Sequence, residues 1–180
     1  MTPTTHQRSE LRSLAERLAH EAGAIALAGR RGADRLAGAT KSSHTDMVTE
    51  FDRAAEAHIV DELRRLRPDD AIIGEEGTDD DGTSGYAWLL DPIDGTTNFV
   101  YDQPAWSCSI AVAHDGTMQA AAVFVPPMDE MFTAALGAGA TLDGRPISAS
   151  TETELDLALV GTGFGYRAET RREQAGHAPR

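Results

Sequence analysis

Apolar residues recur at every third or fourth position in two stretches near the start of the chain, residues 8–28 and 49–66. This spacing predicts two amphipathic helices, each with one apolar stripe that packs on a core. Glycines after the first stretch and Pro68 after the second are typical helix ends. The stripe expected on the second helix consists of Phe51, Ala55, His58, Ile59, Leu63 and Leu66.

Short apolar runs replace the helical spacing after the second helix. Residues 71–73 and 86–90 are expected to be buried strands. The second run stops at Asp91, and Pro92 has no N–H with which to continue a ladder. We therefore expect that strand to end at the carboxylate, with a tight turn after it.

Further strand-like runs follow, separated by turn residues. They are residues 107–113, 118–125, 130–134 and, after a polar junction, 157–162. Asp115-Gly116 between the first two is a hairpin signal. The succession predicts an α+β fold: two N-terminal helices packed on an antiparallel sheet, with the start of a second α/β layer. The expected division is an N-terminal domain over residues 1–150 and the beginning of a C-terminal subdomain over residues 151–180.

The balance of charge argues against one class of partner. The chain of 180 residues has 16 basic and 29 acidic residues, a net charge of −13. Nucleic-acid binding needs clustered Lys and Arg, so no nucleic-acid partner is expected. No signal peptide is recognisable and no apolar run approaches the ~20 residues of a membrane span, so we expect a cytoplasmic protein without a membrane partner. The single cysteine, Cys108, excludes an internal disulfide and a Cys-rich zinc site.

Acidic residues stand where the first two strands end. Glu75 and Glu76 follow one strand, while Asp91 and Asp94 follow the other. If the strands are neighbours, these carboxylates meet, and mutual repulsion raises their pKa values unless a cation neutralises them. Ligands that are all oxygen favour Mg²⁺ or a similar hard ion over zinc.

The residues after Asp94 add a candidate phosphate site. Gly95 permits a tight turn or a close approach to a ligand, and Thr96 and Thr97 resemble a helix start. A cation and a phosphate held side by side predict hydrolysis of a phosphate ester by metal-activated water, which a Glu–Thr pair orients. The structural alternatives are a solvated Glu75-Glu76 pair, a turn built from Asp, Pro and Gly, and a carboxylate of Asp52 that stabilises a helix dipole.

The motifs Gly74-Glu75-Glu76 and Asp91 to Phe99 resemble those of the inositol monophosphatase family. The similarity extends to the segment from Lys41 to Asp52 and to Gly161-Thr162-Gly163-Phe164, over roughly residues 8–170. It implies a Mg²⁺-dependent, lithium-sensitive phosphatase acting on inositol 1-phosphate or a similar small polyol phosphate. It also places Lys41 on a mobile loop near the site.

The resemblance implies two to three Mg²⁺ ions with shared ligands. Glu75, Asp91 and the backbone carbonyl of Ile93 would hold the first ion. Asp91, as a bridging ligand, and Asp94 would hold the second. Glu75, together with Glu76, would contact a third and weaker ion.

The resemblance assigns the remaining roles to the residues around the phosphate. Thr96, supported by Asp52 and acting with Glu75, would activate the attacking water. The phosphate would be contacted by Asp94, Gly95 and Thr96.

One departure from the family pattern bears on function. Members continue into a second α/β half with a W-D-x-x-A-G-type motif, whose Asp completes the second metal site, and this chain has no such motif. We therefore expect a C-terminally truncated chain that exposes one face of its core. A related phosphatase acting on histidinol phosphate or another ester, and a non-catalytic remnant, stay open as alternatives. The resemblance also allows a homodimer.

Overall fold

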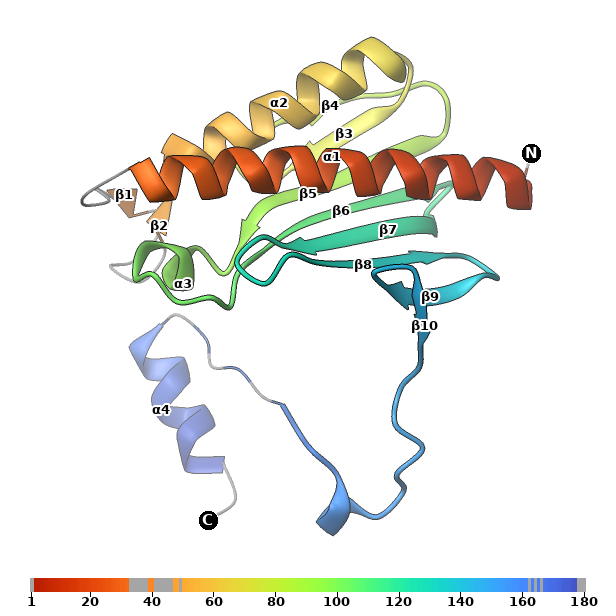
Figure 1. The fold of residues 1–180 in the computed structure, drawn as a ribbon. Helices are drawn as coiled ribbons and strands as arrows, with labels where there is room; N and C mark the ends of the chain where they lie inside the picture. The colour runs from red at the N-terminus through yellow and green to blue at the C-terminus, as the bar shows by residue number, and fades with distance from the viewer. Residues whose placement is uncertain are drawn as a thin grey trace.

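Two long helices lie on one face of a broad sheet in the structure, a computed structural model (Figure 1). It describes residues 2–32, 39–40, 47–48, 50–161, 163, 165 and 167–177. A short third helix lies at one end of the sheet, and the chain after the last strand runs away from it (Figure 1). None of the helices in the described ranges has the length and apolar character needed to cross a membrane.

The two N-terminal helices are α1 (Thr5–Gly32) and α2 (Glu50–Leu66), as the apolar spacing predicts. Helix α1 begins three residues earlier than expected because a capping box forms at its start. The amide of Gln7 donates to Thr4 Oγ1 (3.2 Å), and the amide of Thr4 donates to Gln7 Oε1 (2.8 Å). These bonds satisfy backbone donors that the first helical turn leaves without an intrahelical partner.

The buried face of α2 differs from the expected stripe. Leu66 is 40% exposed, while Phe51 and His58 are only partly buried. Two carboxylates stand in the buried face instead, as its full membership shows: Asp52, Ala55, Glu56, Ile59, Val60 and Leu63. Residues four positions apart lie above one another on a helix, so Asp52 and Glu56 point to the same side.

The main sheet has eight strands in the order β10-β9-β8-β7-β6-β5-β3-β4. Its strands are β3 (Ala71–Gly74), β4 (Asp79–Asp80), β5 (Tyr86–Asp94), β6 (Ser107–His114), β7 (Thr117–Val125), β8 (Glu130–Ala135), β9 (Gly139–Leu142) and β10 (Arg145–Ile147). A separate antiparallel pair consists of β1 (Ala39–Thr40) and β2 (Met47–Val48).

All pairs in the main sheet are antiparallel except β3 and β5, which are parallel. The expectation of a wholly antiparallel sheet is therefore wrong at this pair, and the sheet is mixed. The reason lies in β4, which follows β3 and pairs with its outer side. The chain then crosses back to the inner side of β3 and runs in the same direction, so the two carboxyl ends lie together.

Strand β5 continues past the expected stop at Asp91 and ends at Asp94. Pairing with β6 joins Asp91 to Ser109 and resumes only at Asp94 and Ser107, with an irregular register between them. This bulge accommodates Pro92, which cannot donate to the ladder. The prediction correctly located the interruption but not the return of the strand after it.

The hairpin signal Asp115-Gly116 is confirmed at the turn between β6 and β7. Both residues have positive φ, 47° at Asp115 and 75° at Gly116. Such angles at both central positions define the type I′ turn, whose twist matches that of the strands it joins.

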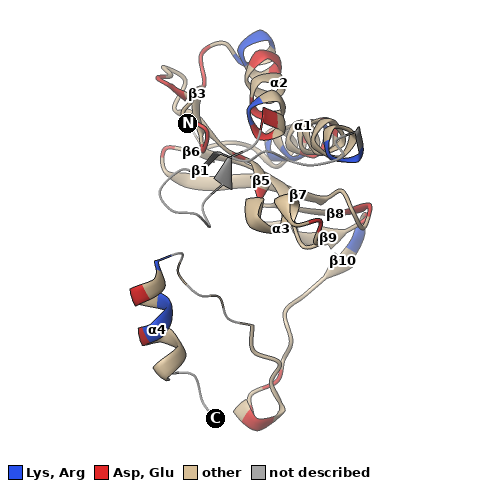
Figure 2. Ribbon diagram, turned by 90° about the vertical axis from the view of Figure 1, so that its left-hand side faces the viewer, with Lys and Arg blue, Asp and Glu red and all other residues tan. Residues whose placement is uncertain are grey.

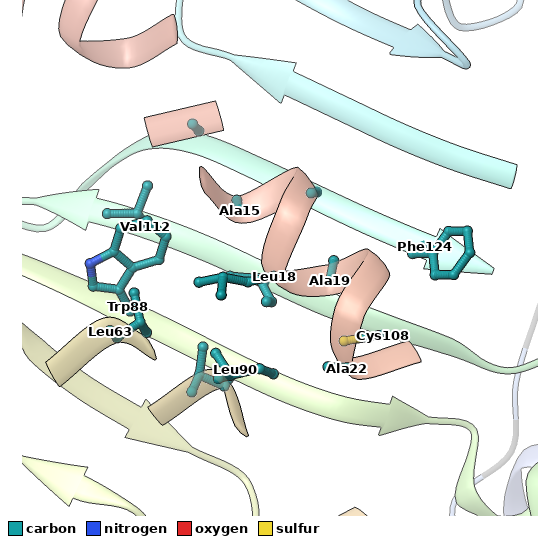
Figure 3. Close-up of a cluster of buried hydrophobic side chains, with 14 of the residues drawn as sticks. Ala15, Leu18, Ala19, Ala22, Leu63, Trp88, Leu90, Cys108, Val112 and Phe124 are labelled. Carbon is teal, nitrogen blue, oxygen red and sulfur yellow. The ribbon is translucent and has the colours of Figure 1, made fainter. Parts of the chain in front are cut away.

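The main core lies between α1, α2 and the sheet (Figure 3). Trp88 and Leu90 of β5 belong to one buried cluster with Leu18 of α1 and Leu63 of α2, and Trp88, Leu18 and Leu63 are fully buried. Burying a side chain of this size stabilises the fold by roughly 1.5–3 kcal/mol. The cluster therefore fixes both helices over the centre of the sheet.

Residues 157–161 do not form the strand expected over residues 157–162, and Thr162 lies outside the described residues. A single 3-10 turn, η1 (Leu155–Leu157), is followed by described residues without regular structure and then by α4 (Ala168–His177). Leu159 is 102% exposed and Val160 is 68% exposed. A strand needs a neighbour to accept and donate its backbone hydrogen bonds, and nothing in the described chain pairs with this segment. Helix α4 carries charges of both signs and lies apart from the sheet (Figure 2).

Candidate functional site

Parallel pairing places two predicted metal ligands next to each other. Gly74 is in register with Leu90, so Glu75 and Asp91 are the residues that follow the last paired positions of β3 and β5. The amide of Glu75 donates to the carbonyl of Leu90 at 3.0 Å, which ties the two strand ends together. Glu75 is exposed and Asp91 is partly buried. The condition on which the metal site was predicted, that the two strands are neighbours, is met.

The bulge in β5 turns the next predicted residues toward a short helix, α3 (Thr96–Val100). Ile93 is fully buried, and its carbonyl accepts a hydrogen bond from the Thr96 hydroxyl at 3.1 Å. Asp94 is exposed. The side chain of Thr96 therefore lies beside the same carbonyl that was predicted to bind a metal ion.

Gly95 is the residue before α3, and only glycine fits there. Its φ is 90°, a left-handed conformation that a side chain strains. A Cβ atom would also lie 2.9 Å from the carbonyl oxygen of Ala105. The tight turn predicted at this position is confirmed.

Helix α2 contributes two buried carboxylates on the side facing the sheet. Asp52 lies in its first turn and is completely buried, and Glu56 is 4% exposed. Glu56 accepts hydrogen bonds from the amide of Glu76 and from Thr78, in the turn that follows β3. Glu56 was not predicted from the sequence, although an acidic residue four positions after Asp52 in an apolar stripe was a usable signal.

The negative charge at this end of the sheet affects the pKa of Cys108 in β6. Burial raises the pKa of its thiol well above the usual range, and the negative charges of Asp91 and Asp52 raise that pKa further. These two carboxylates therefore act on the same buried position. A concentration of negative charge in a partly buried place is favourable only when positive charge compensates it.

Two side chains fasten α3 to its surroundings. Arg30, near the end of α1, donates from Nε to the carbonyl of Phe99 (3.0 Å) and pairs through Nη2 with Asp102 (2.9 Å). Asn98 donates to the carbonyl of Ala105 at 2.6 Å. Neither Arg30 nor Asn98 was assigned a role from the sequence, because each acts on a backbone carbonyl that no motif reveals.

The donor atoms of the predicted ligands suit one class of metal ion. Glu75, Asp91, Asp94 and the carbonyl of Ile93 offer oxygen only, which fits a hard divalent cation such as Mg²⁺. Within the described ranges, no three side chains of Asp, Glu, His or Cys lie close enough together to hold an ion. The predicted ligands thus share one end of the sheet without forming a closed cage. Lys41 lies outside the described residues.

Several known proteins are similar to this chain in sequence. The family model described as the inositol monophosphatase family matches residues 7–179. The chain is 42% identical over 193 residues to the inositol-1-monophosphatase of Mycobacterium bovis, which covers 97% of this chain and 66% of that protein. It is 46% identical over 125 residues to the Nus factor SuhB of Pseudomonas aeruginosa, covering 68% of this chain and 46% of that protein.

Solved structures show the same arrangement of helices and sheet. Mycobacterium tuberculosis SuhB superimposes with a TM-score of 0.78 and 38% identity, over 94% of this chain and 63% of that one. An inositol monophosphatase from Anabaena superimposes with a TM-score of 0.75 and 33% identity, over 88% and 56% of the two chains. The chain therefore spans between about half and two thirds of the length of these relatives.

Proposed function

Because the chain belongs to the inositol monophosphatase family, we propose that it hydrolyses inositol 1-phosphate, or a similar small polyol monophosphate, with Mg²⁺ as cofactor. The observation that carries this proposal is the parallel register of β3 and β5, which brings Glu75 next to Asp91. Two carboxylates from neighbouring strands, with Thr96 on the adjoining turn, form the kind of oxygen-rich site that phosphate chemistry uses.

The residues of the site have separate tasks in this proposal. Bound Mg²⁺ lowers the pKa of a water molecule and neutralises charge on the phosphate. The Thr96 hydroxyl donates a hydrogen bond to the Ile93 carbonyl, so its oxygen lone pairs are free to accept a hydrogen bond from one O–H of the attacking water. Glu75 is exposed at the strand end and would serve as the base that takes the other proton of that water, as its oxygen bonds to phosphorus and the ester P–O bond breaks to release the alcohol.

Metal binding is assigned to the same residues that the resemblance implied. Glu75, Asp91 and the carbonyl of Ile93 would hold one ion, Asp91 and Asp94 a second, and Glu76 would assist at a third. Asp94, Gly95 and Thr96 would contact the phosphate, and the buried Asp52 would support Thr96. The shared position of these residues at one end of the sheet supports the assignment.

A second candidate comes from the names of the relatives. The Nus factor SuhB proteins of Pseudomonas aeruginosa and Escherichia coli are 46% and 39% identical to this chain. Their similarity favours, as a second candidate, a role as a Nus factor. The third alternative, a related phosphatase, differs from the main proposal only in the alcohol portion of the substrate.

Phosphate release separates these candidates. We expect the chain to release phosphate from inositol 1-phosphate in millimolar Mg²⁺, and to lose this activity with a chelator or in Asp94→Asn. Asp115→Asn is the matched control, because Asp115 is an exposed carboxylate in the turn between β6 and β7, at the opposite end of β5 from Asp94, and Asn tolerates its φ of 47°.

Three results would contradict or change the proposed function. Activity that survives both chelation and Asp94→Asn contradicts the metal mechanism. Faster release from histidinol phosphate than from inositol 1-phosphate favours the related phosphatase. If the chain releases phosphate from neither ester, the result favours the Nus factor role over both phosphatase proposals.

A further inference from the structure

Glu56 is a buried carboxylate that binds a single turn of backbone. Its Oε2 accepts from the amide of Glu76 at 2.9 Å. Its Oε1 accepts from the Thr78 hydroxyl at 2.8 Å and from the Thr78 amide at 3.3 Å. A carboxylate that is 4% exposed needs such donors, because burial without them is unfavourable.

Gly74, the residue before this turn, has no side chain and so leaves space for the same carboxylate. A Cβ atom at Gly74 would lie 2.6 Å from both Cδ and Oε2 of Glu56. Gly74 has no positive φ, so close packing against Glu56 is the reason that no side chain fits there. The carboxylate therefore lies directly over the backbone where β3 ends.

Glu75 stands between these two contacts. Its preceding residue, Gly74, lies under the carboxylate of Glu56, and the amide of its following residue, Glu76, donates to that carboxylate. The turn is closed by the amide of Gly74, which donates to the carbonyl of Thr78 at 2.7 Å. The path of the backbone through Glu75 is thus held from α2 on both sides.

We propose that Glu56 is a positioning residue, which fixes the turn after β3 so that Glu75 stays beside Asp91. This inference rests on the proposed function for its consequence, because Glu75 is a ligand and base only in that reaction. Glu56 is not among the residues assigned to the phosphate or the attacking water. It acts as a partner behind the ligands, a kind of contact whose loss typically weakens metal affinity or activity by about 10- to 100-fold.

Four variants of the full chain test the proposal. Glu56→Ala removes both acceptors, and Glu56→Gln keeps one oxygen acceptor while replacing the other with a donor. Gly74→Ala leaves Glu56 intact but displaces its carboxylate, because the new methyl group occupies the same space. Asp61→Asn is the matched control, since Asp61 is an exposed carboxylate on the same helix.

Two measurements are made on each variant. Hydrogen exchange by NMR reports the opening of the Glu76 and Thr78 amides. Calorimetric titration with Mg²⁺ alone, without substrate, reports metal affinity. We expect Glu56→Ala to raise both exchange rates at least about tenfold and to weaken Mg²⁺ binding about 10- to 100-fold. Glu56→Gln and Gly74→Ala should have smaller effects in the same direction, and Asp61→Asn none.

The outcomes distinguish this proposal from the proposed function. Unchanged amide exchange in Glu56→Ala overturns the positioning role, as does faster exchange with unchanged Mg²⁺ affinity. If the unsubstituted chain binds Mg²⁺ but releases no phosphate, the proposed function is wrong. Amide exchange and Mg²⁺ affinity still test the positioning role of Glu56, because neither measurement depends on phosphate release. If Glu56→Ala does not fold, Glu56→Gln and Gly74→Ala decide by the same two criteria. If the unsubstituted chain binds no Mg²⁺, the consequence assigned to Glu56 is overturned together with the metal site.

Discussion

Cys108 is the residue on which burial and the charges of the site act together. It is fully buried in β6, and both burial and the carboxylates of Asp91 and Asp52 raise the pKa of its thiol. A thiol that stays protonated is a weak nucleophile, because the thiolate is the reactive form. In the folded chain, Cys108 is therefore a packing residue.

Because the pKa of the Cys108 thiol is raised, the free energy of unfolding should fall at alkaline pH. Below about pH 8.5, the usual pKa of a free thiol, Cys108 is protonated in both the folded and the unfolded chain. Above that pH the unfolded chain loses the proton and the folded chain keeps it. The free energy of unfolding then falls by about 1.4 kcal/mol per pH unit until the folded pKa is reached.

Urea denaturation between pH 7.5 and 10 checks this prediction with Cys108→Ala as the comparison. The variant should lose a constant amount of stability from its smaller side chain but show a flatter decline with pH. Parallel curves for the two proteins would contradict a raised thiol pKa. Other titrating groups cancel in the difference, because both proteins contain them.

At the scale of elements, the position of α3 depends on α1. Helix α3 has only five residues, too few to be stable alone, and its first residue, Thr96, is one of the three predicted phosphate contacts. Arg30 of α1 binds the carbonyl of Phe99, and its side chain is 18% exposed. Its ion pair with Asp102 adds little, since that carboxylate is 81% exposed.

Replacing Arg30 tests this connection. A hydrogen bond from a charged donor stabilises by roughly 1.5–3 kcal/mol. Arg30→Gln should therefore speed exchange of the Tyr101 and Gln103 amides by about tenfold or more and reduce phosphate release. Arg31→Gln is the control, because Arg31 is the exposed neighbour on the same helix. Equal exchange in the two variants would show that α3 is held by other contacts.

At the scale of the molecule, the two faces of the sheet are unequal. Helices α1 and α2 cover one face (Figure 1). On the other face, one row of paired residues runs through Ile73, Leu89, Ala111, Ala121 and Ala134, and all are exposed or only partly buried. Leu159 and Val160, between η1 and α4, are further exposed apolar side chains. Apolar area of this kind favours association.

Self-association of the chain is the measurable consequence. We expect its sedimentation coefficient to rise with concentration, and the double substitution Leu159→Asp with Val160→Asp to reduce that rise. Thr151→Asp with Thr153→Asp is the control, because it adds the same charge at nearby exposed positions. Sedimentation as a monomer at every concentration would contradict the prediction.

The sequence by itself determined the helices, most strands and the chemical character of the site. Periodicity locates α1 and α2 because each buries one continuous stripe, and Asp115-Gly116 locates a hairpin because few residues tolerate its backbone angles. The order of Asp91, Asp94, Gly95 and Thr96 indicates oxygen ligands before a turn, since these preferences are local properties of the residues.

The tertiary structure decided the features that depend on distant contacts. The parallel pairing of β3 with β5 follows from the crossing after β4, and it alone brings Glu75 to Asp91. The apolar run at residues 157–162 had the composition of a strand but no neighbour in the described chain to pair with it. In the sequence, nothing distinguishes Glu56 from an ordinary glutamate on a helix. The packing of α2 on the sheet places its carboxylate against Gly74. The sequence specifies which chemical group each side chain carries, whereas the tertiary structure determines which other groups it contacts.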